Sequence, residues 1–386
     1  MPPLWYSPKT QKLRPKHKHL KFLNRFFDEF PIIDSSNVKN LQSLDSIYLG
    51  QDARIVWSPD ENTVAAAAVN DIHLYELGSP ARALQVLIGH TEPVNSLAFF
   101  PNGAPLASVA QDGTLRLWDP VSGSELLSLD LIPFFNFAPW ADWVSFSPDG
   151  TQLATFAGQD STLYIWDAIN LGNTPPRAIP WFDHAGPIAN VTISPDWQTL
   201  AWVSRGTLQL MDFTTTPLME PPQFADFISQ IEFTPNSQTL LVLAAETIHG
   251  QYTSVVISYD ARTGTRLHTI AFDEFARNFV VGPDGQTLAI SSDSGITFWN
   301  AVTGKEPAPF ISLASIAQIL AISPDGSILS SANDRGDINL FAIDSGTLLG
   351  TLPGDPGINR LTFRGEGKVL VAEYFDGKIQ VWGVKE

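Results

Sequence analysis

The fold is decided by residues 89–119, whose sequence is GHTEPVNSLAFFPNGAPLASVAQDGTLRLWD. Apolar residues alternate with polar ones in three short segments, which is typical of β-strands with one buried face. The segments are separated by Pro101-Asn102-Gly103 and by the tight turn at Asp112-Gly113. Because proline cannot donate a hydrogen bond within a sheet and glycine tolerates turn conformations, both sites end a strand. The stretch therefore predicts three antiparallel strands.

The same pattern recurs along the chain, with a Pro-Asp-Gly-like turn between the first and second strand of each unit. Successive turns are separated by 42, 47, 47, 40, 48, 41 and 41 residues. A four-stranded propeller blade needs roughly 40 to 45 residues. The sequence thus predicts an all-β, eight-bladed β-propeller, with seven blades and one irregular hairpin as the alternative. The turns begin at Pro59, Pro101, Pro148, Pro195, Pro235, Pro283, Pro324 and, in degenerate form, Gly365.

The last unit lacks an outer strand, because only four residues follow Trp382. An open blade would expose a strand edge. Residues 41–44 (LQSL) align with residues 84–87 (LQVL), the outer strand that leads into the second blade. We therefore expect an N-terminal outer strand to close the ring.

Residues 89–119 resemble a complete WD repeat, and the resemblance extends over about residues 38–386. In that family a His, a Ser or Thr, an Asp and a Trp form a hydrogen-bonded group within a blade; the matching residues are His90, Ser108, Asp112 and Trp118. The resemblance implies a structural role for these four residues. A catalytic Ser-His-Asp interpretation is less favoured, since parts of the pattern recur in other repeats. The cysteine-free, Ala-rich repeats are more similar to bacterial-type WD repeats than to eukaryotic ones.

Two units depart most from the pattern. The fourth has Met211 at the Trp position and Arg205-Gly206 at the turn, and the fifth contains a longer loop through residues 248–251. We expect these blades to be the softest part of the ring.

Charge is distributed unevenly. Residues 1–25 contain seven basic and no acidic residues, so the formal charge of −17 requires −24 on the rest of the chain. An acidic propeller is expected to repel nucleic acid and anionic lipid.

We divide the chain into a basic extension, residues 1–37, and the propeller, residues 38–386. The extension is interpreted as a partly disordered tail or a short amphipathic helix with apolar residues from Leu20 to Phe30; a partner-binding or weak membrane-surface role stays open.

The resemblance implies a scaffold that binds a protein or peptide on the loop-rich top face of the ring. Large aromatic residues at mapped top-face positions, with polar neighbours, are typical of interface hot spots. They could alternatively fold inward over the central channel as core. The candidate partner-binding residues are Trp140, Asp142, Phe227, Phe275, Arg277, Ile316, Gln111, Gln159 and Phe375.

The absence of cysteine excludes disulfides, thiolate metal sites and cysteine nucleophiles. The sequence contains no phosphate loop, calcium loop or zinc-spaced His pair, and we predict no catalytic residue, no metal and no cofactor. The alternatives to a protein-binding scaffold are a hydrolase or oxidoreductase propeller, a small-molecule binder and a sensory or assembly module tethered by the basic tail.

No apolar run reaches the roughly 18 residues needed to span a bilayer. We expect a cytoplasmic monomer or a subunit of a hetero-complex.

Overall fold

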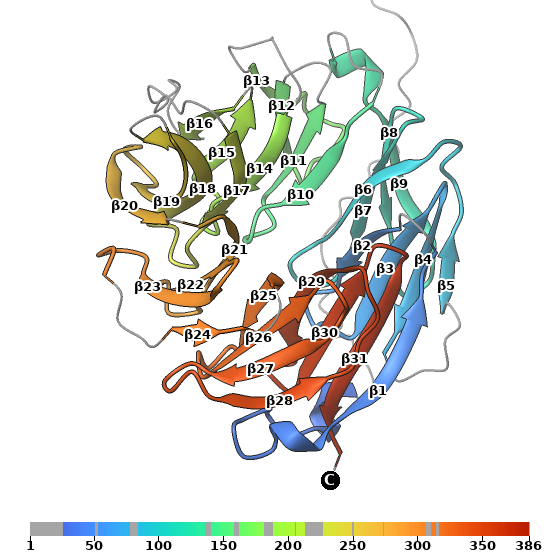
Figure 1. The fold of residues 1–386 in the computed structure, drawn as a ribbon. Helices are drawn as coiled ribbons and strands as arrows, with labels where there is room; N and C mark the ends of the chain where they lie inside the picture. Colours follow the sequence, from blue (N-terminus) through green and yellow to red (C-terminus); the bar gives the residue numbers. More distant parts are fainter. Residues whose placement is uncertain are drawn as a thin grey trace, which may run out of the picture.

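A computed structural model shows eight sheets arranged in a ring, with the first strand of each blade toward the centre (Figure 1). The prediction of an eight-bladed β-propeller is confirmed. The structure describes residues 26–385 except 51–52, 78–83, 136–139, 158–161, 181–187, 205, 213–226, 249–250, 273, 306–309 and 314–315.

Each blade is an antiparallel meander, and its strands follow one another outward in chain order, except that the outermost strand of blade 8 comes from the N-terminal part of the chain. Blade 4 has three strands among the described residues. Blades 1 to 4 consist of β2 (Arg54–Trp57), β3 (Thr63–Ala68), β4 (Asp71–Glu76) and β5 (Gln85–Leu87); β6 (Val94–Phe99), β7 (Leu106–Ala110), β8 (Thr114–Trp118) and β9 (Glu125–Asp130); β10 (Trp143–Phe146), β11 (Gln152–Ala157), β12 (Thr162–Asp167) and β13 (Arg177–Pro180); and β14 (Ile188–Ile193), β15 (Thr199–Ser204) and β16 (Thr207–Asp212).

The remaining blades follow the same order, and blade 5 has the longest strands. Blades 5 to 8 consist of β17 (Phe227–Phe233), β18 (Thr239–Ile248), β19 (Gln251–Asp260) and β20 (Arg266–Phe272); β21 (Ala276–Val281), β22 (Thr287–Ser292), β23 (Gly295–Asn300) and β24 (Ile311–Ser312); β25 (Ala317–Ile322), β26 (Ile328–Asn333), β27 (Ile338–Ala342) and β28 (Leu348–Leu352); and β29 (Ile358–Arg364), β30 (Val369–Tyr374) and β31 (Lys378–Val384).

The ring is closed by β1 (Leu41–Tyr48), as predicted. This strand pairs antiparallel with β31, from Leu41 opposite Val384 to Tyr48 opposite Lys378. It is the outer strand of blade 8, so that blade combines the two ends of the chain. The pairing covers the edge that β31 would otherwise expose.

The turns between first and second strands are held by their own side chains. In blade 3 the Asp149 carboxylate accepts hydrogen bonds from the Ser147 hydroxyl at 2.7 Å and from the Thr151 backbone at 2.9 Å. The following residue, Gly150, has φ of +69°, a conformation that glycine adopts without strain. Blade 1 has Glu61 at the matching position, with φ of +60°.

The hydrophobic core lies between neighbouring blades. Val109 and Leu115 of blade 2, for example, cluster with Val144 and Leu153 of blade 3, and all four are nearly inaccessible. Burying such side chains contributes about 1.5 to 3 kcal/mol each. The ring is therefore stabilised by blade-on-blade packing as well as by the sheets themselves.

The segment before β1 packs on the face opposite to the start of the inner strands. It forms two short 3₁₀ helices, η1 (Phe26–Glu29) and η2 (Val38–Asn40). Phe27 and Ile33 are buried, and the Ile33 N–H donates to the Gly367 carbonyl at 2.9 Å. Within the described residues the expected amphipathic helix is limited to the single turn of η1, and residues 1–25 lie outside the described part of the chain. A third 3₁₀ helix, η3 (Ile132–Phe134), follows β9.

Candidate functional site

The top face, defined as the end of the ring where the inner strands begin, has a β-bulge in six blades. A β-bulge leaves one residue without a partner in the ladder. The residues skipped by the strand pairing are Asn95, Ala189, Ser229, Arg277, Gln318 and Asn359. Among them, Arg277 is a predicted partner-binding residue. The rim of the ring therefore carries a series of residues that lie outside the regular ladder.

Three phenylalanines on this face are largely exposed. Phe227, the first residue of β17, is 60% exposed; Phe275, just before β21, is 53% exposed; and Phe375, just after β30, is 69% exposed. Arg277 lies with its guanidinium carbon 4.8 Å from the centre of the Phe275 ring, and it forms an ion pair with Asp293 at 2.8 Å. These phenylalanine side chains are therefore surface groups and not core.

Other candidate residues are more engaged. Trp140 is half-buried, and its indole N–H donates to the Asp142 carboxylate at 3.2 Å. The Gln111 amide donates to Asn95 at 3.3 Å, and Asn95 in turn donates to the Ala141 carbonyl of the next blade. Ile316 is partly buried, and Gln159 lies outside the described residues. Trp140 is thus only partly at the surface, and its hydrogen bond is local.

The structure brings His90, Ser108, Asp112 and Trp118 together inside blade 2. The His90 ring contacts the Asp112 carboxylate at 2.9 Å and the Ser108 hydroxyl at 2.7 Å, and the Trp118 indole N–H donates to the same hydroxyl at 2.8 Å. Ser108 and Trp118 are inaccessible to solvent. Burial lowers the pKa of the His90 imidazole, although its hydrogen bond to Asp112 acts in the opposite direction. A buried hydroxyl that accepts from the indole and contacts a neutral imidazole suits a structural brace rather than a nucleophile.

Blade 5 differs from the sequence-based expectation. The predicted longer loop through residues 248–251 is wrong, because β18 continues to Ile248 and β19 starts at Gln251. The insertion lengthens both strands instead. Alternating Thr, Val, Ile and Tyr residues favour strand conformation throughout this stretch.

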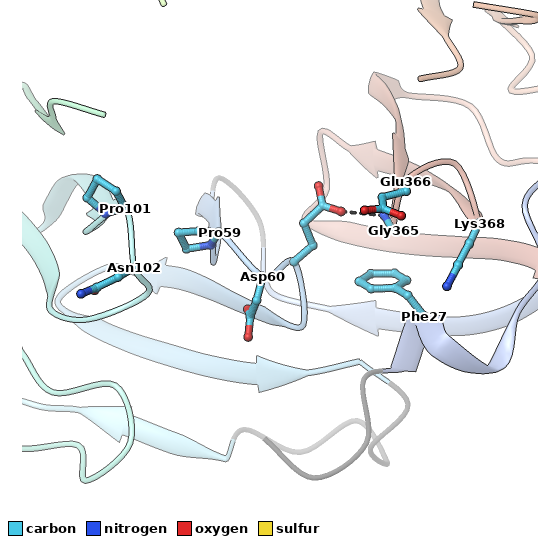
Figure 2. Close-up of a pocket in the computed structure, with 9 residues that line it drawn as sticks. Phe27, Pro59, Asp60, Pro101, Asn102, Gly365, Glu366 and Lys368 are labelled. Atoms are coloured by element: carbon cyan, nitrogen blue, oxygen red, sulfur yellow. Dashed lines mark hydrogen bonds between the residues drawn. The ribbon is translucent and has the colours of Figure 1, made fainter. Parts of the chain in front are cut away.

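The opposite face has a pocket of about 460 Å³ that sequence reasoning did not find. Figure 2 shows Phe27 beside the turn at Gly365, facing the proline turns of blades 1 and 2. Its ionisable residues are Asp60, Glu61, Glu366 and Lys368. The Glu61 carboxylate is already used, since it accepts from the Gly365 N–H at 2.6 Å. The pocket arises from turns that lie at opposite ends of the chain, so no local sequence signal marks it.

One partly buried acid lies on an inner strand. Burial raises the pKa of Glu232, in β17, to about 7, while its hydrogen bond with Gln230 and the positive charge of Arg360 lower it. Arg360 belongs to β29, the inner strand of blade 8, so its charge acts on Glu232 across the middle of the ring.

No group of three His, Asp or Glu side chains in the described part of the chain could hold a metal ion. No helix among the described residues is long and apolar enough to cross a membrane.

A family model for the WD domain, G-beta repeat, matches residues 81–119 and 142–167. These segments cover the three inner strands of the braced blade 2 and of blade 3, together with β5 of blade 1, within a ring of eight such sheets. The chain therefore contains WD repeats.

Curated relatives of this WD-repeat protein come from several eukaryotes. Nuclear distribution protein PAC1 of Arthroderma benhamiae is 28% identical over 241 residues, covering 59% of this chain and 44% of that protein. The serine-threonine kinase receptor-associated protein of Gallus gallus is 23% identical, covering 68% and 70%. The guanine nucleotide-binding protein subunit beta of Zea mays is 32% identical, covering 28% and 31%. The chain thus spans less than half the length of the fungal relative, and the bacterial-type character of its repeats stays a prediction.

A crystal structure of the computationally designed Ika8 protein superimposes on the WD-repeat ring with a TM-score of 0.63. It shares 20% of the sequence and covers 88% of this chain and 99% of its own. At this identity the likeness describes the fold alone.

Proposed function

We propose that this WD-repeat protein is a cytoplasmic interaction scaffold that binds a protein partner on the top face of its ring. The observation that carries the proposal is the exposure of Phe227, Phe275 and Phe375 at the rim. Large aromatic side chains surrounded by polar groups are common hot spots of protein interfaces. Each contributes about 2 kcal/mol or more when a partner buries it.

The surroundings of the phenylalanines support this proposal. Arg277 lies against the Phe275 ring and is itself fixed by Asp293, so this part of the surface is ordered before binding. Preorganised side chains lose less conformational entropy on association. The bulged residues Ser229 and Asn359 are exposed and add polar groups to the top face. This combination favours a protein surface over a small apolar ligand.

The names of two relatives also support a binding role. "Receptor-associated protein" and "subunit beta" describe proteins that associate with other proteins. We extend this general role, and no particular partner, to the present chain. In the proposal the chain acts within a hetero-complex and has no catalytic activity of its own.

The test compares capture of partners from a native extract by the wild-type chain and by the double variant Phe227→Ser/Phe275→Ser. Because both side chains are already exposed, the variant should keep its free energy of unfolding within about 0.5 kcal/mol. A top-face partner should be lost from the captured set, and its affinity for the variant, measured by titration, should fall at least about 30-fold.

The matched control is Leu126→Ser/Leu348→Ser. These leucines are 46% and 52% exposed but lie on the outer strands β9 and β28. The control should retain every partner. If the top-face variant retains all partners, or the control loses the same ones, the proposed binding face is wrong.

A further inference from the structure

The central hairpin of blade 5 is longer than those of the other blades. Strands β18 and β19 pair through ten residue pairs, from Thr239 opposite Asp260 to Ile248 opposite Gln251. The corresponding hairpins of the other blades have at most six pairs. In Figure 1 the two strands lie between β17 and β20.

The neighbouring strands do not follow the hairpin to its end. Strand β17 starts with Phe227 opposite Ala245, and β20 ends with Phe272 opposite Ser254. Three residues of each central strand therefore extend past this line, which corresponds to about 10 Å at roughly 3.3 Å per residue. Among the described residues, no strand pairs with residues 251–253 on the side of β19 that faces β20. Within the described part of the chain, the backbone donors and acceptors of this edge therefore have no ladder partner on that side.

The edge lacks the devices that usually prevent strand pairing. Natural edge strands are protected by Lys, Pro, bulges or a covering element. The sequence from Ile248 to Tyr259, IHGQYTSVVISY, contains no Lys, Arg, Asp, Glu or Pro. Tyr252 is 78% exposed, more than any other large hydrophobic side chain among the described residues. An unprotected edge with high β-propensity is suited to accept another strand.

We infer that residues 251–253 of β19 bind an extended segment of a partner protein, which adds to blade 5 as a further β-strand. The propeller of a second copy is disfavoured as the occupant, because the part of each chain after residue 25 carries a formal charge of −24. The same charge favours a segment with basic flanking residues. The inference rests on the proposed function: the hairpin extends beside Phe227, so one partner can contact both the aromatic rim and the strand edge.

The test uses a shortened hairpin in which residues 246–253 are replaced by Asn-Gly. Ala245 and Ser254 already face each other in the ladder, and Asn-Gly forms a two-residue turn between such positions. The buried residues of the blade, including Val242 and Val255, are retained. The shortened chain should keep the fold. It loses the open edge together with the ion pair between Glu246 and Arg266, which is partly exposed and contributes little to stability, and which Tyr252→Lys leaves in place.

The probe is a phage-displayed library of random nine-residue peptides, selected on the wild-type chain. Selected peptides should be rich in β-branched and basic residues, and synthetic copies should bind the shortened variant at least about 30-fold more weakly. N-methylation of alternate amides should abolish binding in one of the two registers, because only every second amide of an added strand faces its neighbour. Selection of no peptide, equal binding to both proteins, or indifference to both methylation patterns would overturn the inference.

Two further variants separate the possible failures. The substitution Tyr252→Lys places a charge on the edge without changing hairpin length, and it should weaken peptide binding even if the shortened chain fails to fold. The variant Phe227→Ser/Phe275→Ser keeps the edge and should still bind the peptides. If the peptides bind the edge variants normally, strand addition is wrong while the aromatic rim stays a binding site. Retention of every natural partner by the phenylalanine variant would instead contradict the proposed function itself.

Discussion

The Glu61 carboxylate joins the two ends of the propeller by accepting a hydrogen bond from Arg364 at 3.0 Å. Glu61 belongs to the first turn of blade 1, and Arg364 ends the inner strand of blade 8. The Arg364 side chain is 10% exposed and its guanidinium lies 4.2 Å from the Trp57 ring centre. The seam where the ring closes thus has a polar network in addition to the strand β1.

We expect Glu61→Ala to destabilise the protein by about 2 kcal/mol, because it leaves a largely buried guanidinium without its carboxylate. The measurement is the free energy of unfolding in urea. Glu366→Ala is a matched control, since Glu366 also has a positive φ, +58°, at a turn of the same pocket. Equal losses for the two variants would show that the turn conformation, and not the ion pair, explains the effect.

Ser108→Ala tests the brace of blade 2. The change removes a hydroxyl that contacts both His90 and Trp118, and it leaves two buried polar groups with one partner fewer. We expect a loss of about 2 to 4 kcal/mol in unfolding free energy. Ser330→Ala is the control: Ser330 is equally buried, and its hydroxyl donates to the Ala321 carbonyl and not to a side chain. A loss no larger than that of the control would contradict the brace.

The repeats made most of this fold predictable. Pro148-Asp149-Gly150 and its equivalents predict turns because each of these residue types restricts or permits particular backbone angles whatever the rest of the fold. Eight such turns predict eight blades. Closure was predictable because residues 41–44 repeat the pattern of residues 84–87, an outer strand. The four braced residues of blade 2 could be assigned because one complete repeat contains all of them.

Other features depend on contacts that no local pattern contains. No residue in the sequence indicates that the strand bulges at Arg277. The exposure of Phe275, two residues earlier, could therefore not be predicted from the sequence alone. Trp140 is half-buried, and it donates to Asp142, which is held by the next strand. The Asp142 backbone N–H donates a hydrogen bond to the Phe156 carbonyl at 2.7 Å. In blade 5 the sequence His249-Gly250 is a turn signal that predicts a loop, whereas the flanking residues continue the strand alternation.

Removal of β1 should open the ring. A chain that begins at Leu49 loses the strand that pairs with β31 and the buried side chain of Ile47, which is 2% exposed. We expect a lower melting temperature and aggregation through the exposed edge, observed by light scattering during thermal unfolding. A chain that begins at Phe26 keeps the strand and should melt like the full-length protein. Ile47→Ala should fall between them, with a loss of about 2 to 4 kcal/mol.

Glu232 should make stability depend on pH in the neutral range. Its pKa is raised by burial to about 7, above the ordinary value of 4.5, so ionisation is harder in the folded than in the unfolded state. Stability linked to this group is therefore fully present below about pH 4.5 and is lost as the pH rises toward and through 7.

The substitution Glu232→Gln preserves the size of the side chain and removes the charge. We expect the variant and the wild type to have similar unfolding free energies at about pH 5, and the variant to be more stable by about 2 kcal/mol at about pH 8. Urea unfolding at intervals of about one pH unit across this range measures the difference. A gap that is the same at every pH would mean that Arg360 and Gln230 fully compensate the buried charge, and that Glu232 stays ionised in the folded protein.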